Sequence, residues 1–200
     1  MPRHLSGILA MAAIVVASNI LVQFPVGHWL TWGALTYPLA FLVTDVMNRV
    51  HGARAARRVV LAGFAIGVVC SLIAAGLDKT TLRIALGSGL AFLLAQMTDI
   101  AVFDRLRTRR WWVAPFWSSC VGSALDTALF FGVAFSAALP PDVNTGWANE
   151  AVPLLGQGPV AALWVSLAVA DWLVKLGLAL LALVPFRITV RNLLRTGRTI

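Results

Sequence analysis

The chain has 200 residues, of which 60% are hydrophobic and only 12% are charged, whereas roughly a quarter of the residues of a soluble domain are charged. This composition excludes a soluble globular domain and predicts a single integral membrane domain over residues 1–200. The net charge of +8 comes mostly from arginines in short clusters between apolar segments. That distribution is typical of orientation in a bilayer and not of nucleic-acid binding.

Six apolar segments approach the length of about 20 residues that a membrane-spanning helix needs. They lie at residues 5–23, 35–50, 59–77, 82–104, 112–139 and 159–184. Arg3 and His4 precede the first segment as in a signal peptide, but its apolar run is too long for one and no convincing cleavage site follows, so we expect a retained helix. The sequence therefore predicts an all-α fold, a six-helix transmembrane bundle.

Lysines and arginines are distributed unequally between the two sides of this predicted bundle. One side receives thirteen of them: Arg3, Arg49, Arg54, Arg57, Arg58, Arg105, Arg107, Arg109, Arg110, Arg187, Arg191, Arg195 and Arg198. The other side receives Lys79 and Arg83. By the positive-inside rule both termini are cytoplasmic, as an even number of spans requires. The segment Pro140–Gly158, rich in Pro, Gly and Asn, is then expected to be an outer loop.

Four carboxylates fall inside predicted spans, on four different helices: Asp45, Asp99, Asp126 and Asp171. A charged side chain at the centre of a bilayer costs about 2.5–3.5 kcal/mol on insertion scales, so it is expected to face the bundle interior and to have a partner. Four such groups indicate a polar site enclosed by the helices.

Helical spacing groups these acids with other polar residues, because residues three or four apart share a helix face. The groups are Gln96 with Asp99, Ser119 and Ser123 with Asp126, Asp171 with Lys175, and Asn19 with Gln23. Several of these groups have a structural alternative. Asp171–Lys175 is a self-neutralising packing pair or a proton relay. Asp45 belongs to the site or pairs with Arg49. The two amides of the first helix form hydrogen bonds between helices or contact a substrate.

Carboxylates combined with amides suit a ligand that has clustered N–H donors and a carbonyl, such as a guanine-type edge. Trp117, Phe130 or Phe131 offers a ring that would stack on it. The same groups also suit a cationic amine or protons. No nucleotide-binding, protease or metalloprotease motif is present, so we expect neither an enzyme nor a cofactor. Cys70 and Cys120 lie in apolar runs and are expected to be buried free thiols.

Five blocks of the sequence together resemble a known family. They are SNILVQFPV (18–26), TWGALTYPLAFLVTDVMNRVHGARAARRVV (31–60), AQMTDIAVFDRLRTRRWW (95–112), VGSALDTALFF (121–131) and DWLVK (171–175). In this order they are similar to the queuosine precursor transporter family, earlier grouped as a vitamin uptake family. The chain departs from that pattern at Ser123, where some relatives have asparagine.

The resemblance implies uptake of 7-cyano-7-deazaguanine, and of its aminomethyl analogue, across the inner membrane for tRNA queuosine modification. It implies a six-helix fold similar to the substrate-binding subunits of energy-coupling-factor transporters, with no direct contact to nucleic acid. The positions that match the family motifs are Asn19, Gln23, Asp45, Gln96, Asp99, Asp126, Asp171 and Lys175. Energy source and oligomeric state stay open. The rival functions are a subunit of an ATP-driven importer, a membrane assembly protein without transport, and a proton-coupled exporter of small amines.

Overall fold

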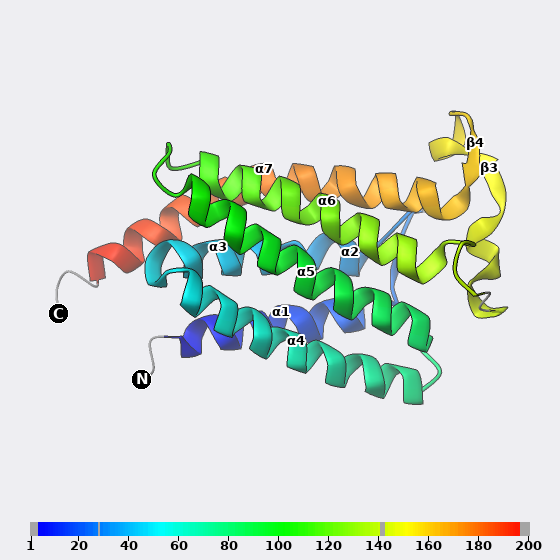
Figure 1. Ribbon diagram of the computed structural model, residues 1–200, viewed down its shortest axis with the longest axis horizontal. Helices are drawn as coiled ribbons and strands as arrows, with labels where there is room; N and C mark the ends of the chain where they lie inside the picture. Colours follow the sequence, from blue (N-terminus) through cyan, green and yellow to red (C-terminus); the bar gives the residue numbers. More distant parts are fainter. Residues whose placement is uncertain (1–3, 28, 141–142, 197–200) are drawn as a thin grey trace.

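The computed structural model describes residues 4–27, 29–140 and 143–196, with the side chain of Thr196 excepted. Helices dominate this part of the chain and run along the long axis of the molecule (Figure 1). In chain order the α-helices are α1 (Leu5–Leu21), α2 (Trp32–Thr36), α3 (Leu39–His51), α4 (Ala53–Gly76), α5 (Leu82–Leu106), α6 (Val113–Phe135) and α7 (Leu163–Thr196).

The second predicted span is divided at Tyr37 and Pro38 into α2 and α3. Pro38 has no backbone N–H to donate to the preceding turn, so a helix does not run through it but starts beside it. Our prediction of one continuous helix over residues 35–50 is corrected accordingly. The side chain of Thr31 caps the short α2 by accepting a hydrogen bond from the backbone N–H of Ala34 at 3.3 Å.

Helices α4 and α7 extend further into the basic clusters than the hydropathy of the sequence indicated. α4 begins at Ala53 and not at residue 59, and α7 continues to Thr196, beyond the expected end at residue 184. Arginine is a good helix former, so the arginine-rich ends stay helical even where they leave the apolar region. Gly52 has φ +86°, a left-handed conformation that lets the chain turn from α3 into α4.

The expected outer loop has local structure of its own. It contains two 3-10 helices, η1 (Val143–Asn149) and η2 (Leu154–Gly156), and a hairpin in which β3 (Ala151–Pro153) pairs antiparallel with β4 (Val160–Ala162). A second small hairpin, β1 (Pro25–Val26) with β2 (Leu30–Thr31), connects α1 to α2. Arg83 of α5 connects this helix to the end of α6 and the segment after it by donating hydrogen bonds to the carbonyls of Val133, Ser136 and Pro140.

Apolar side chains cover the outside of the helices, and polar side chains are buried between them. Four helices are long and apolar enough to cross a membrane, namely α4, α5, α6 and α7, and α1 is a shorter apolar helix. Large apolar side chains such as Leu72, Leu86 and Leu181 are well exposed, whereas all four intramembrane aspartates are buried. This inverted arrangement is that of an all-α multi-pass membrane protein.

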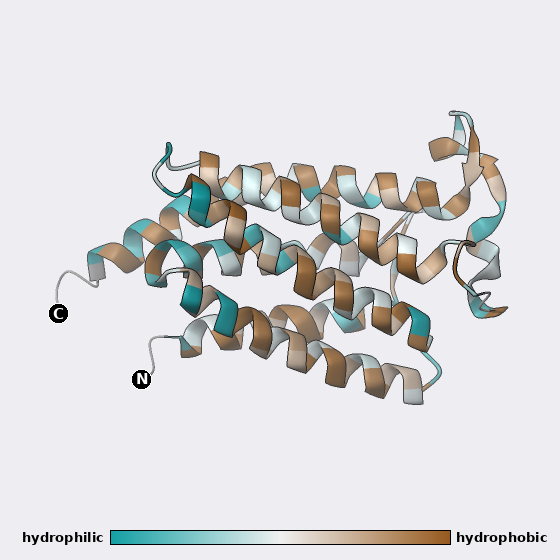
Figure 2. Cartoon of the chain, in the orientation of Figure 1, coloured by the Kyte–Doolittle hydropathy of each residue, from teal (hydrophilic) through white to brown (hydrophobic). Residues whose placement is uncertain are grey.

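The start of α1 and the end of α7 lie at the same end of the molecule (Figure 1). The arginine-rich start of α4 and end of α5 are at this end too, and hydrophilic residues gather toward the ends of the helices (Figure 2). Cys70 and Cys120 are free, as predicted, but both are partly exposed and not buried.

Candidate functional site

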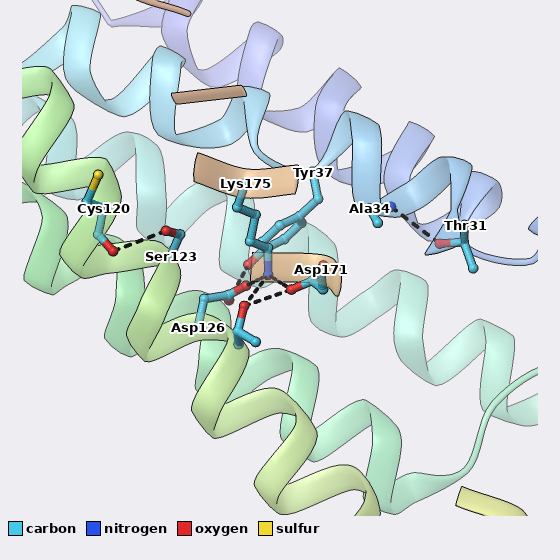
Figure 3. Close-up of polar contacts among 9 residues, drawn as sticks. Thr31, Ala34, Tyr37, Cys120, Ser123, Asp126, Asp171 and Lys175 are labelled. Carbon is cyan, nitrogen blue, oxygen red and sulfur yellow. Dashed lines mark hydrogen bonds and ion pairs between the residues drawn. The ribbon is translucent and has the colours of Figure 1, made fainter. Parts of the chain in front are cut away.

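Lys175 of α7 is the centre of a buried polar cluster that also includes residues of α2–α3 and α6 (Figure 3). Its Nζ donates to Oδ2 of Asp171 at 2.5 Å, to Oδ2 of Asp126 at 2.6 Å and to Oγ1 of Thr127 at 3.0 Å. Thr127 in turn donates to Oδ2 of Asp171 at 2.7 Å, and the hydroxyl of Tyr37 donates to Oδ1 of Asp126 at 3.1 Å. We call these five residues the lysine cluster.

The lysine cluster joins three segments by charge-assisted hydrogen bonds. The pair predicted four residues apart, Asp171–Lys175, is confirmed, but Lys175 also neutralises Asp126, which has no cation on its own helix. One buried ammonium group therefore serves two carboxyl groups. Removing it would leave both carboxyl groups without a cation in a low-dielectric interior, which is strongly unfavourable.

A second buried cluster lies between α3, α5 and α6 and holds Asp45 and Asp99. Oδ1 of Asp45 accepts a hydrogen bond from Ser118 at 3.1 Å, and Oδ2 accepts one from Ser119 at 3.3 Å. Asp99 lies close enough to Asp45 and Ser118 to interact electrostatically with both. Asp45 forms no ion pair with Arg49 within the described ranges, and Arg49 instead donates to the carbonyl of Arg107 at 2.8 Å. The alternative of an Asp45–Arg49 pair is therefore wrong.

The second cluster is incompletely satisfied. Both carboxylate oxygens of Asp99 and the amide nitrogen of Gln96 are buried without a hydrogen bond of normal geometry to any described residue. Gln96 uses only its oxygen, which accepts from Thr44 at 2.6 Å. A buried polar group without a partner costs about 1–3 kcal/mol, so such groups are rare and point to a functional requirement. The carboxylate of Asp99 and the amide N–H group of Gln96 therefore lack a partner on the same face of α5.

A narrow pocket with a volume of only about 20 Å³, about the size of one water molecule, lies between the two clusters. Its polar lining residues are Asp45, Ser119, Ser123 and Lys175, and its apolar wall includes Phe41, Leu178 and Phe186. Asp99 does not line the pocket, but it lies beside Asp45, which does. Carboxylate, hydroxyl and ammonium groups therefore converge on one small space with apolar walls.

The helices that carry the two clusters approach each other closely at Gly122. A Cβ atom added to Gly122 would lie 2.7 Å from a ring carbon of Phe41, 3.2 Å from Cβ of Asp99 and 3.3 Å from the carbonyl of Ala95. The glycine thus lets α6 pack against α5 directly beside the open carboxylate.

Gly122→Ala is expected to destabilise the protein by about 1–3 kcal/mol, because overpacking forces the neighbouring ring or helix to move. Gly132→Ala on the same helix is the matched control, since nothing lies within 4 Å of its added methyl group. The control is expected to be neutral or to stabilise by about 0.5–1 kcal/mol. Thermal unfolding of both variants in detergent measures the difference, and equal stability of the two would contradict the close approach.

Not every residue predicted for the site lies there. Asn19 is partly exposed and donates to the carbonyl of Val15 in its own helix at 2.9 Å. Helix α1 ends at Leu21, two residues earlier than expected, so Gln23 is exposed beyond its end. The two amides therefore do not share a helix face. Ser123 donates to the carbonyl of Cys120 and lines the pocket.

The aromatic residues proposed to stack on a ligand lie elsewhere. Trp117 is 50% exposed and packs edge-on against Phe116. It faces away from the pocket because it is two residues from both Pro115 and Ser119, which line the pocket. Phe130 and Phe131 pack with Phe135 in a separate apolar cluster near the hairpin end. None of these three rings lines the pocket, and Phe41 and Phe186 are the rings beside it.

Three residues of the clusters were not singled out from the sequence: Tyr37, Thr44 and Ser118. Thr44, Asp45 and Asn48 have helical spacing, so a polar stripe on this helix was present in the sequence. Tyr37 had no such signal, because its partner Asp126 is 89 residues away.

Comparisons with known proteins show the family of the chain. The family model described as "Putative vitamin uptake transporter" matches residues 31–190. A curated protein of Escherichia coli (strain K12), named "Queuosine precursor transporter", is 32% identical over 90% of this chain and 83% of its own length. The chain belongs to the queuosine precursor transporter family.

Two further members of the family are similar over most of their length. The "Probable queuosine precursor transporter" of Haemophilus influenzae (strain ATCC 51907 / DSM 11121 / KW20 / Rd) is 30% identical over 90% of this chain and 83% of its own. The protein of the same name from Bacillus subtilis (strain 168) is 26% identical over 82% of this chain and 72% of its own. No solved structure matches the chain.

Proposed function

We propose that this chain imports queuosine precursors across the bacterial inner membrane. The observation that carries the proposal is the 32% identity to a queuosine precursor transporter over 90% of the chain. The specific substrate we propose is 7-cyano-7-deazaguanine, with its aminomethyl analogue as a second substrate, and their destination is the queuosine modification of tRNA.

The chemistry of the second cluster supports a guanine-like ligand. A carboxylate accepts hydrogen bonds from a ring N–H and the adjacent amino group at once, and an amide N–H serves the neighbouring carbonyl oxygen. The carboxylate oxygens of Asp99 are the acceptors without a partner, and the amide nitrogen of Gln96 is the donor without a partner. Asp45 is a second carboxylate, and it lines the pocket. We assign this edge of the substrate to Asp45 and Asp99. Asp126 already binds Lys175 and Tyr37, so we assign it to holding Lys175, which lines the pocket.

We further propose six membrane crossings, made by α1, the divided α2–α3 segment and α4 to α7. The arginine-rich ends of α4, α5 and α7 then face the cytoplasm with both termini. Trp111 and Trp112 at this end and Trp32 and Trp147 at the other are exposed, as expected of rings at the two interfaces. A fold similar to the substrate-binding subunits of energy-coupling-factor transporters stays a prediction.

Purified protein in liposomes tests the proposal against its rivals. Saturable uptake of radiolabelled 7-cyano-7-deazaguanine by the chain alone is expected, and repeating it with and without a proton gradient determines the energy source. Binding without uptake would favour a subunit that needs an ATP-driven module. Neither binding nor uptake would favour a membrane assembly protein, and export of cationic amines would favour the exporter.

A further inference from the structure

A second pocket lies at the arginine-rich end of the bundle, separate from the lysine cluster and from Asp45. It has a volume of about 370 Å³ and is lined by Arg49, Trp111, Phe186, Arg187, Val190 and Arg191. The residues come from three places in the chain, the end of α3, the turn before α6 and the last third of α7. Three guanidinium groups therefore border one open space.

These three arginines have no carboxylate to neutralise them in the part of the chain that the structure describes. The ion pairs found there are Arg107–Asp104 and those of Lys175. Asp45 attracts Arg49 from deeper in the bundle without forming an ion pair, and Arg107 repels it. Arg187 and Arg191 are four residues apart on one helix face, an arrangement that is unfavourable for like charges. Orientation in the membrane requires positive charge at this end, but it does not require arginines to converge on one pocket.

Two of the three arginines lie against aromatic rings. The guanidinium carbon of Arg187 lies 4.6 Å from the centre of the Trp111 ring, and that of Arg49 lies 5.2 Å from the centre of the Phe103 ring. Stacking on a ring leaves the N–H groups at the edge of the guanidinium plane available to donate, and one of those of Arg49 already donates to the carbonyl of Arg107. Arginine in this geometry suits bidentate hydrogen bonding to the oxygens of a phosphate.

The position of the pocket along α7 places it at the level of lipid headgroups. α7 has 34 residues, a length of roughly 51 Å, whereas the hydrocarbon core of a bilayer is about 30 Å thick. The last third of the helix therefore leaves the core, and the C-terminal part of α7 runs at an angle to the rest of the helix (Figure 1), which contains Pro185. Ile188 and Leu194 beside the arginines are exposed and apolar, as expected of a surface in contact with acyl chains.

We propose that this pocket binds a phosphate group, supplied by the headgroup of an acidic phospholipid such as phosphatidylglycerol in the cytoplasmic leaflet. Basic pockets between membrane helices on this side bind such headgroups, and each arginine near the surface strengthens binding roughly fivefold. The lipid neutralises the converging arginines and ties the end of α7 to α3 and to the start of α6. The inference does not depend on the transported substrate.

Thermal unfolding of the purified full-length chain in detergent tests the site with three probes: phosphatidylglycerol, phosphatidylcholine and inorganic phosphate at equal concentrations. The melting temperature is expected to rise with phosphatidylglycerol and not with the other two. The variant Arg187→Gln/Arg191→Gln should lose this rise, and Arg191→Gln alone, which leaves the Trp111 contact intact, should need roughly fivefold more lipid for the same rise. The control Arg57→Gln/Arg58→Gln, exposed on α4 at the same end, should keep it.

Each other outcome contradicts a definite part of the proposal. An equal rise with inorganic phosphate would overturn the lipid as the source and assign the site to a free anion. No rise with any probe, or an equal loss in the Arg57/Arg58 control, would overturn the site itself.

Discussion

Asp99→Asn is expected to lower uptake of the substrate by roughly tenfold to a hundredfold, while the protein becomes no less stable. The loss corresponds to one charge-assisted hydrogen-bonded contact, because asparagine offers only one acceptor oxygen and turns an N–H donor toward the substrate. Stability is retained because both oxygens of Asp99 are buried without a hydrogen bond of normal geometry, so the exchange removes none. Opposite effects on uptake and stability are typical of residues kept for function.

Asp104→Asn is the matched control for this prediction. It lies five residues further along α5, is about half exposed and pairs only with Arg107 at the helix end. Its uptake is expected to stay within about twofold of the unsubstituted protein, because an exposed ion pair contributes about 0–1 kcal/mol. Initial uptake rates and melting temperatures of both variants, corrected for the amount of protein in the membrane, measure the outcome. If Asp99→Asn transported normally, Asp99 would not be part of the site.

Lys175→Met is expected to destabilise the protein by about 3–5 kcal/mol, the largest effect on stability that we predict. The substitution keeps much of the side-chain volume but leaves Asp126 and Asp171 buried without their only cation in the lysine cluster. The hydrogen bonds from Tyr37 and Thr127 do not compensate for the lost charge. Unfolding in detergent, followed by tryptophan fluorescence, gives the difference in free energy.

Two further variants separate the loss of charge balance from the loss of packing. The triple variant Lys175→Met/Asp126→Asn/Asp171→Asn removes the unpaired acids together with the base, so it should recover most of the stability. Lys79→Met, at an exposed position in the turn after α4, should change stability by less than about 0.5 kcal/mol. A triple variant as unstable as Lys175→Met alone would show that packing, and not charge, explains the loss.

Hydropathy predicted most of the fold because the bilayer restricts spanning segments to apolar helices. The cores of the four helices found long and apolar enough to cross a membrane lie within the segments expected from the sequence. The errors occur where hydropathy has no information. It does not report where the arginine-rich ends of α4 and α7 stop being helical, nor that Pro38 separates α2 from α3. The hairpins that connect the helices depend on pairing between segments and gave no hydropathy signal.

The site was predictable to the extent that its contacts lie within one helix. Spacing correctly paired Asp171 with Lys175 and placed Gln96 beside Asp99 on a buried face. Contacts between helices were not predictable, because they depend on rotation and packing: Lys175 with Asp126, Tyr37 with Asp126, and Ser118 with Asp45. Trp117 was misplaced for the same reason, since an aromatic residue in an apolar helix faces lipid as readily as the interior.

The central claim is transport of a queuosine precursor, and queuosine in tRNA is its most direct readout. Cells that neither synthesise the precursor nor have their own importer would be given this protein and a low external concentration of 7-cyano-7-deazaguanine or its aminomethyl analogue. We predict that queuosine returns to tRNA with the unsubstituted protein and with Asp104→Asn, and not with Asp99→Asn present at the same level in the membrane. Absence of queuosine with both compounds, despite normal amounts of protein, would contradict the claim.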